Sequence, residues 1–196
     1  MRALLAVFRP RDRRSGLSDR HAARRKGAAR TRPGRRVTPV RRLGLAIVLV
    51  VFVIDQALKL WLLFGLRLAE TGPFAVMPFM DIVLAWNRGI SYGLFQQHSD
   101  IGRWGLVVIS IAAAIWLGRW MWREPRPLTV ASLALIVGGA LGNGLDRAVY
   151  GAVVDFVHLH WGSFSWYIFN VADAAIVVGV VGLLYESFRP AADNAA

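Results

Sequence analysis

The stretch LGLAIVLVVFVIDQALKLWLLFGL, from Leu43 to Leu66, is the first of four apolar runs that decide the fold of this chain. The other three are approximately Trp104–Trp122, Leu128–Leu145 and Ile168–Phe188. Each run is close to the length of about 20 residues that a helix needs to cross a bilayer. Hydrophobic residues make up 56% of the 196 residues, more than a soluble domain usually carries. These features predict an all-α integral membrane protein with four transmembrane helices.

A basic segment precedes the first run. Residues 1–42 hold more than half of the chain's 24 Lys and Arg residues, and such a composition cannot bury enough apolar surface to fold alone. We interpret residues 1–42 as a disordered cytoplasmic tail, 43–190 as the membrane domain and 191–196 as a short C-terminal tail. Nucleic-acid binding is the alternative for a basic block. Because Phe8 is the only aromatic residue in the tail, we expect no nucleic-acid partner.

Positive charge predicts the orientation of the helices, because cytoplasmic connections are enriched in Lys and Arg. The tail is basic, and so is the link between the second and third runs, which contains Arg119, Arg123 and Arg126. Both termini are therefore expected in the cytoplasm, and the segments Arg67–Arg103 and Asp146–Tyr167 are expected outside. The first of these has strand-like runs between Gly and Pro residues. It predicts a small β-rich extracytoplasmic segment between the first and second helices.

Ionisable and amide side chains in the apolar runs are candidate functional residues, because burying a charge in a bilayer costs roughly 2.5–3.5 kcal/mol. Asp55 and Lys59 are four residues apart, so they share a helix face and can neutralise each other. A structural ion pair and a catalytic role both fit this spacing. Asn143, Asp146 and Arg147 share a face of the third run for the same reason.

Two aspartates suggest the chemistry. Asp173 lies three residues after Asn170 at the outer end of the fourth run, and Asp155 lies in the outer segment just before it. Alone, Asp173 could be an acidic residue that stabilises a helix N-terminus. Two carboxylates that meet cannot both ionise cheaply, so one keeps a proton while the other accepts one from water. Such a pair can hydrolyse a peptide bond by acid–base catalysis and needs no metal or cofactor.

Other interpretations are weaker. His158 and His160 lie near Asp155 and could suggest a metal site, but their alternation is typical of a strand. A Ser–Lys dyad would need Lys59 to meet Ser91, for which the sequence offers no argument. A transporter that relays protons through aspartates would place them near the middle of the membrane, whereas here two of them cluster at one end.

Five motifs occur in order along the chain: DQALK (Asp55–Lys59), NRGISYGLF (Asn87–Phe95), GGALGNGLDR (Gly138–Arg147), VVDF (Val153–Phe156) and FNVADAAI (Phe169–Ile176). In this order and spacing they resemble the lipoprotein signal peptidases, or signal peptidase II, a family of four-helix aspartic peptidases of the bacterial inner membrane. The chain departs from many members at three positions that bear on pocket shape, Ile90, Ser91 and Tyr92.

The resemblance implies that Asp155 and Asp173 are the catalytic dyad. It implies supporting or substrate-binding roles for Asn87, Gly89, Asn143, Arg147, Asn170, Asp55 and Lys59. The implied substrate is a prolipoprotein whose cysteine carries a diacylglyceryl group and which is cut just before that cysteine. The expected partners are these precursors and membrane lipid. We expect a multi-pass monomer with its active site near the periplasmic face.

Overall fold

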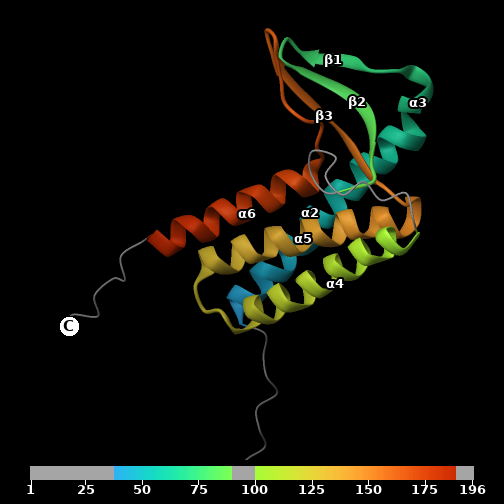
Figure 1. Ribbon diagram of the computed structural model, residues 1–196. Coiled ribbons are helices and arrows are strands. Elements are labelled where there is room, and N and C mark those ends of the chain that lie inside the picture. Colours follow the sequence, from blue (N-terminus) through green and yellow to red (C-terminus); the bar gives the residue numbers. More distant parts are fainter. Residues whose placement is uncertain (1–37, 90–99, 189–196) are drawn as a thin grey trace, which may run out of the picture. The chain divides into compact units, whose positions relative to one another are not determined.

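The computed structural model describes residues 38–89 and 100–188. Within these ranges four helices are long and apolar enough to cross a membrane. They are α2 (Pro39–Leu60), which continues as the π-helical turn η1 (Trp61–Gly65), and α4 (Asp100–Arg123), α5 (Pro127–Tyr150) and α6 (Val171–Phe188). The four apolar runs therefore form the predicted helices (Figure 1).

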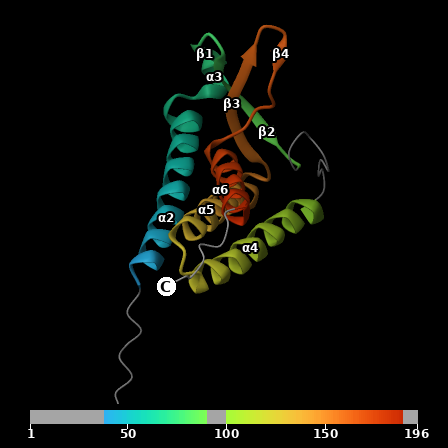
Figure 2. The ribbon, with the colours of Figure 1, turned by 90° about the vertical axis from the view of Figure 1, so that its left-hand side faces the viewer.

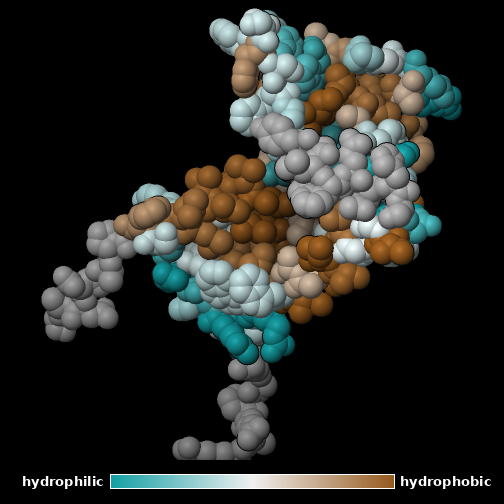
Figure 3. All heavy atoms as spheres, viewed as in Figure 1, coloured by the Kyte–Doolittle hydropathy of each residue, from teal (hydrophilic) through white to brown (hydrophobic). Residues whose placement is uncertain are grey.

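Helix α5 lies at the centre of this bundle. It contacts α2, α4 and α6, and 61% of its most apolar window is buried inside the protein, against 11–22% for the other three helices. Small residues allow this packing, since a Cβ placed on Gly139 would collide with the Ala172 carbonyl oxygen of α6. The outer helices leave many apolar side chains exposed, and brown side chains cover much of the helical region in Figure 3.

The first helix starts earlier than the apolar run suggested. Helix α2 begins at Pro39, where Thr38 is the N-cap and its hydroxyl accepts from the Arg41 N–H at 3.4 Å. The Arg41 side chain donates to the Trp122 carbonyl at 2.9 Å and lies over the Trp122 ring. The helix therefore includes the last basic residues before Leu43, because a long basic side chain can fold back along the helix end. The rest of the predicted N-terminal tail, and the predicted C-terminal tail, lie outside the described residues.

Beyond one end of the helices lies an antiparallel sheet with the order β1-β2-β3-β4. Strands β1 (Phe74–Met77) and β2 (Met80–Asn87) come from the first outer segment, while β3 (Val153–Trp161) and β4 (Phe164–Ser165) come from the second. The short helix α3 (Leu68–Thr71) connects η1 to β1 (Figures 1 and 2).

The prediction of a β-rich segment between the first and second helices was thus incomplete. The sheet joins both outer segments, with Ala85 of β2 opposite Asp155 of β3. Backbone groups of a strand need partners, and the nearest strand emerges at the same end of the bundle. A buried cluster of Leu62, Leu68 and Phe156 fastens the sheet to η1. This attachment fixes β3 beside the start of α6.

Candidate active site

Asp155 lies on β3 and is only 2% exposed. Its Oδ2 accepts from Asn87 Nδ2 at 3.0 Å, and its Oδ1 accepts from Asn170 Nδ2 at 2.7 Å. Asn87 is the last residue of β2, and Asn170 directly precedes α6. Amides from two elements therefore hold one carboxylate in place.

Asp173 lies in the first turn of α6 and is partly exposed. Its Oδ1 accepts from Asn143 Nδ2 at 2.8 Å, and its Oδ2 accepts from the Asn170 N–H at 3.3 Å. The Asp173 N–H donates in return to Asn170 Oδ1 at 2.9 Å, as in a capping box. Asp173 therefore has the helix-terminal role that the sequence left open. It also lies beside Asn170, and this position brings it close to Asp155.

Hydrogen bonds fix the orientations of the Asn143 and Asn170 side-chain amides. Asn143 Oδ1 accepts from Asn170 Nδ2 at 3.1 Å and from Lys59 Nζ at 3.3 Å. Because only the amide oxygen can accept these two bonds, it must face Lys59 and Asn170, and Asn143 Nδ2 must point toward Asp173. The asparagines predicted as supporting residues are thus donors to the two aspartates.

Burial raises the pKa of the Asp155 carboxyl to about 7, and the nearby charge of Asp173 adds to this rise. The N–H donors of Asn87 and Asn170 and the positive charge of Lys59 act in the opposite direction. Near neutral pH this pair of carboxyls therefore holds a proton that it can exchange.

A cavity of about 340 Å³ opens at Asp173, between α4, α5 and α6. Its polar end is formed by Asn87, Asn143, Arg147 and Asp173, and the remainder is mostly apolar, including Leu106, Ile109, Ala113, Ala140, Ile176 and Val177. A site of this kind can hold a backbone segment at the polar end and apolar groups beyond it.

Arg147 connects the cavity to the first outer segment. Its Nη2 donates to the Gly89 carbonyl at 2.8 Å, and its Nη1 donates to the Asn143 carbonyl at 3.3 Å. The Gly89 N–H in turn donates to Asn87 Oδ1 at 3.0 Å, which aims the Asn87 amide at Asp155. Arg147 Nε is buried and has no partner within the described ranges.

The Asp55–Lys59 ion pair is present and includes a third member. Lys59 Nζ lies 2.7 Å from Asp55 Oδ2 and 2.7 Å from Asp146 Oδ2, and all three side chains are at most 1% exposed. Asp146 shares a helix face with Asn143 and Arg147, but it was not among the expected site residues. Its i, i+3 spacing from Asn143, which also contacts Lys59, was the signal that could have identified it.

The histidines lie apart from the aspartate pair. His160 Nε2 and His158 Nδ1 lie 3.1 Å and 3.7 Å from Asp81 Oδ2 on the neighbouring strand. Among the residues with described positions, no group of three or more His, Cys, Asp or Glu could hold a metal ion. Three residues named in the sequence analysis lie outside the described residues: Ile90, Ser91 and Tyr92.

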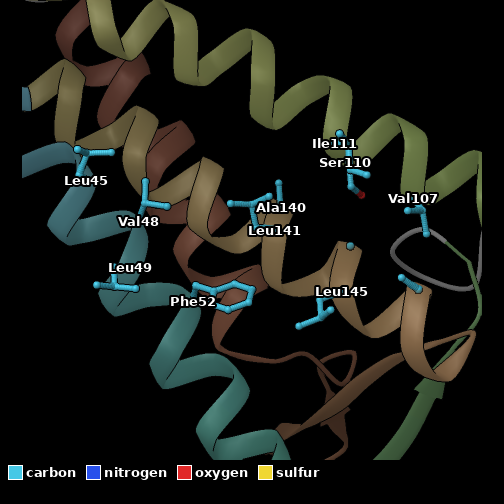
Figure 4. A pocket seen from close by; sticks show the side chains of 12 residues that line it. Leu45, Val48, Leu49, Phe52, Val107, Ser110, Ile111, Ala140, Leu141 and Leu145 are labelled. Atoms are coloured by element: carbon cyan, nitrogen blue, oxygen red, sulfur yellow. The ribbon is translucent and has the colours of Figure 1, made fainter.

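A second cavity, of about 470 Å³, lies between α2, α4 and α5 (Figure 4). Its lining is aliphatic and aromatic apart from Ser110, whose hydroxyl donates to the Leu106 carbonyl at 3.0 Å. It offers an apolar surface but no reactive group, so we assign the chemistry to the cavity at Asp173.

A family model described as Signal peptidase (SPase) II matches residues 47–189. The chain belongs to the signal peptidase II family. A lipoprotein signal peptidase of Methylorubrum extorquens (strain PA1) is 60% identical over 150 residues, covering 76% of this chain and 88% of the relative. Another, from Methylobacterium radiotolerans, is 60% identical over 154 residues, covering 79% and 90%.

Two solved structures of a bacterial membrane enzyme have a similar fold. A bacterial membrane enzyme has a TM-score of 0.64 at 25% identity, over 78% of this chain and 94% of that one. A second such structure has a TM-score of 0.62. This signal peptidase II is therefore a membrane-spanning peptidase of the bacterial inner membrane that removes signal peptides from prolipoproteins.

Proposed function

We propose that the chain is an aspartic endopeptidase that cuts diacylglyceryl-modified prolipoproteins just before the lipidated cysteine, with Asp155 and Asp173 as its dyad. One observation carries the proposal. The two carboxylates come from β3 and α6, yet both bind Asn170, through its side chain and its backbone N–H respectively. The charge of Asp173 also contributes to the raised pKa of Asp155, as expected for carboxyls that share a site.

The two aspartates take different roles. Asp155 is buried and has a pKa of about 7, so it holds the shared proton and donates it to the oxygen of the scissile carbonyl. Asp173 lines the cavity and accepts a proton from the water that attacks the carbonyl carbon. When the tetrahedral intermediate collapses, the C–N bond breaks, the proton on Asp173 passes to the leaving amine, and one hydroxyl proton of the gem-diol returns to Asp155, which restores the shared proton.

Other polar groups at the cavity position the substrate. Arg147 Nε is a buried donor without a partner in the described part of the chain, and we assign it to a substrate carbonyl. Asn87 and Gly89 hold this end of the cavity together through Arg147 and Asp155. The apolar walls contributed by α4 and α6 accept the hydrophobic part of the signal peptide.

The first prediction is that Asp155→Asn and Asp173→Asn each abolish cleavage, because an amide cannot hold or accept the proton. The measurement is cleavage of a diacylglyceryl-modified precursor by the purified protein in lipid nanodiscs without added metal. Mass determination of the new N-terminus tests the cut before the cysteine.

Thr129→Val serves as the control for this prediction. Thr129 is a buried residue at the other end of α5 whose hydroxyl has no partner among the described residues, so its nearly isosteric replacement should leave cleavage unchanged. Normal cleavage by either aspartate variant would refute the dyad.

The proposal also includes sidedness, partners and oligomeric state. We propose that the sheet and the dyad lie on the periplasmic side, that both termini are cytoplasmic, that the surrounding lipid is a direct partner and that the monomer is active. The positions of Arg119, Arg123 and Arg126 support this sidedness, since they lie at the α4–α5 link, away from the sheet. Hydrophilic side chains gather at that end in Figure 3.

A further inference from the structure

A buried cluster around Lys59 contacts the chain next to each of the two aspartates of the dyad. The Lys59 ammonium has three acceptors, Asp55 Oδ2 at 2.7 Å, Asp146 Oδ2 at 2.7 Å and Asn143 Oδ1 at 3.3 Å. An ammonium has three N–H donors, so Lys59 is fully paired with protein groups. It lies between α2, which carries Asp55, and α5, which carries Asp146.

Each carboxylate of this cluster also accepts from a backbone N–H. Asp55 Oδ1 accepts from the Ala172 N–H at 2.9 Å, and Asp146 Oδ2 accepts from the Val154 N–H at 3.1 Å. Ala172 directly precedes Asp173, and Val154 directly precedes Asp155. Both backbone positions are fully buried.

A neutral side chain adds a second link between the carboxylates. Gln56 Nε2 donates to Asp146 Oδ1 at 2.9 Å and to Asp55 Oδ2 at 3.1 Å. Lys59 and Gln56 therefore each link Asp55 to Asp146. These two links give a defined separation to the backbone positions that Asp55 and Asp146 hold.

We infer that Asp55, Lys59 and Asp146 form a positioning clamp that sets the spacing between Asp155 and Asp173 by holding the backbone before each of them. Asp146 thereby gains a role in catalysis, although it does not touch the reacting atoms. The inference rests on the proposed function of the dyad. Buried ion pairs contribute little net stability compared with apolar replacements, whereas these two hydrogen bonds place the backbone directly before each aspartate.

The distance between Asp155 and Asp173 affects the pKa of Asp155, and this effect can be measured. The charges that act on Asp155 are those of Asp173 from α6, Lys59 from α2 and Arg147 from α5. Asp55 from α2 and Asp146 from α5 flank Lys59. If the clamp loosens and the dyad separates, the charge of Asp173 acts on Asp155 from farther away, and the pKa of Asp155 falls. The high-pH limit of activity then moves toward lower pH.

The test is Asp146→Glu, which keeps the charge but adds a methylene. The longer side chain cannot hold Lys59 and the Val154 N–H in their present places. We expect kcat per folded enzyme to fall, KM for the lipidated precursor to stay unchanged and the high-pH limb to move to lower pH. Gln56→Leu, which removes the second link together with a 3.3 Å bond to the Gly142 carbonyl, should give a smaller shift in the same direction and covers the case in which Asp146→Glu does not fold.

The controls separate this inference from the dyad proposal. Thr129→Val should keep the wild-type pH profile, and thermal melting reports any general loss of stability. A wild-type kcat and pH profile for the folded Asp146→Glu or Gln56→Leu protein would overturn the clamp, as would a lower melting temperature with an unchanged profile. If Asp155→Asn remains active, the dyad itself is wrong, which is a distinguishable result.

Discussion

At the scale of single residues, the site depends on which atoms donate to Asp155. Its carboxylate accepts from the side-chain N–H groups of Asn87 and Asn170, and these bonds favour the charged form, against the effect of burial. Burial has the larger effect, so the carboxyl titrates near neutral pH. The pH dependence of cleavage therefore reports on individual hydrogen bonds.

The second prediction concerns Asn87→Ala. Loss of the N–H donor removes a bond to the charged carboxylate, so the pKa of Asp155 rises further above its usual range. A hydrogen bond to a charged group is worth about 1.5–3 kcal/mol, which corresponds to a shift of roughly one pH unit or more. Because the active dyad keeps one proton, the high-pH limb of kcat/KM should move to higher pH, opposite to the shift expected for Asp146→Glu. A high-pH limb at the wild-type pH or at lower pH would contradict the role of Asn87 as a donor to the charged Asp155 carboxylate.

At the scale of elements, the contact between α5 and α6 decides where Asp173 lies. Gly139 faces Ala172, and a Cβ there would meet the Ala172 carbonyl oxygen and approach Ile176 Cγ1 at 2.8 Å. A backbone carbonyl cannot move aside without moving its helix. The position of Asp173, one residue further along α6, therefore depends on a missing side chain in α5.

The third prediction is that Gly139→Ala displaces the start of α6 and lowers both turnover and melting temperature, by overpacking of about 1–3 kcal/mol. The matched control is Gly118→Ala in α4, where an added Cβ meets nothing within 4 Å. There the change should be neutral or slightly stabilising, since Ala favours a helix over Gly by about 1 kcal/mol. Equal effects of the two changes on turnover would show that the α5–α6 contact does not position the dyad.

At the scale of the whole membrane domain, the sheet presents an apolar surface beyond the helices. Trp161 and Phe164 are paired in register, so they lie on one face, and they are 77% and 60% exposed. Exposed aromatic rings of this kind favour the headgroup layer of a bilayer, so we expect lipid to cover them.

The fourth prediction tests this lipid contact. The chain contains no cysteine, so Ser163→Cys, between the two rings, can carry a single fluorescent probe in nanodiscs. Aromatic rings favour the headgroup layer, so lipid-borne quenchers should remove most of the emission and a water-soluble quencher little. A probe at Glu70→Cys, whose side chain is 73% exposed beside Arg67, should behave in the opposite way. Protection that depends on protein concentration would instead indicate a second copy on this face.

The sequence predicted the helices well because crossing a bilayer imposes a length and a composition that any single segment displays. It also predicted that Asn143, Asn170 and Lys59 would lie near the aspartates, through helical spacing and family motifs. It did not predict that the second outer segment supplies half of the sheet. Nor did it predict that Asp146 pairs with Lys59, because strand pairing and ion-pair partners depend on which segments meet in space.

The amino-acid sequence by itself determined four membrane helices and indicated the two aspartates that we propose as the dyad, since hydrophobic length and family motifs are local properties of the chain. Only the tertiary structure decided how those aspartates are held. Asp155 has its raised pKa because β3 is buried against β2 and α5, and we infer that its spacing from Asp173 depends on bonds from α2 and α5 to the preceding residues. Burial and distance are properties of packing between distant segments, and no stretch of sequence contains them alone.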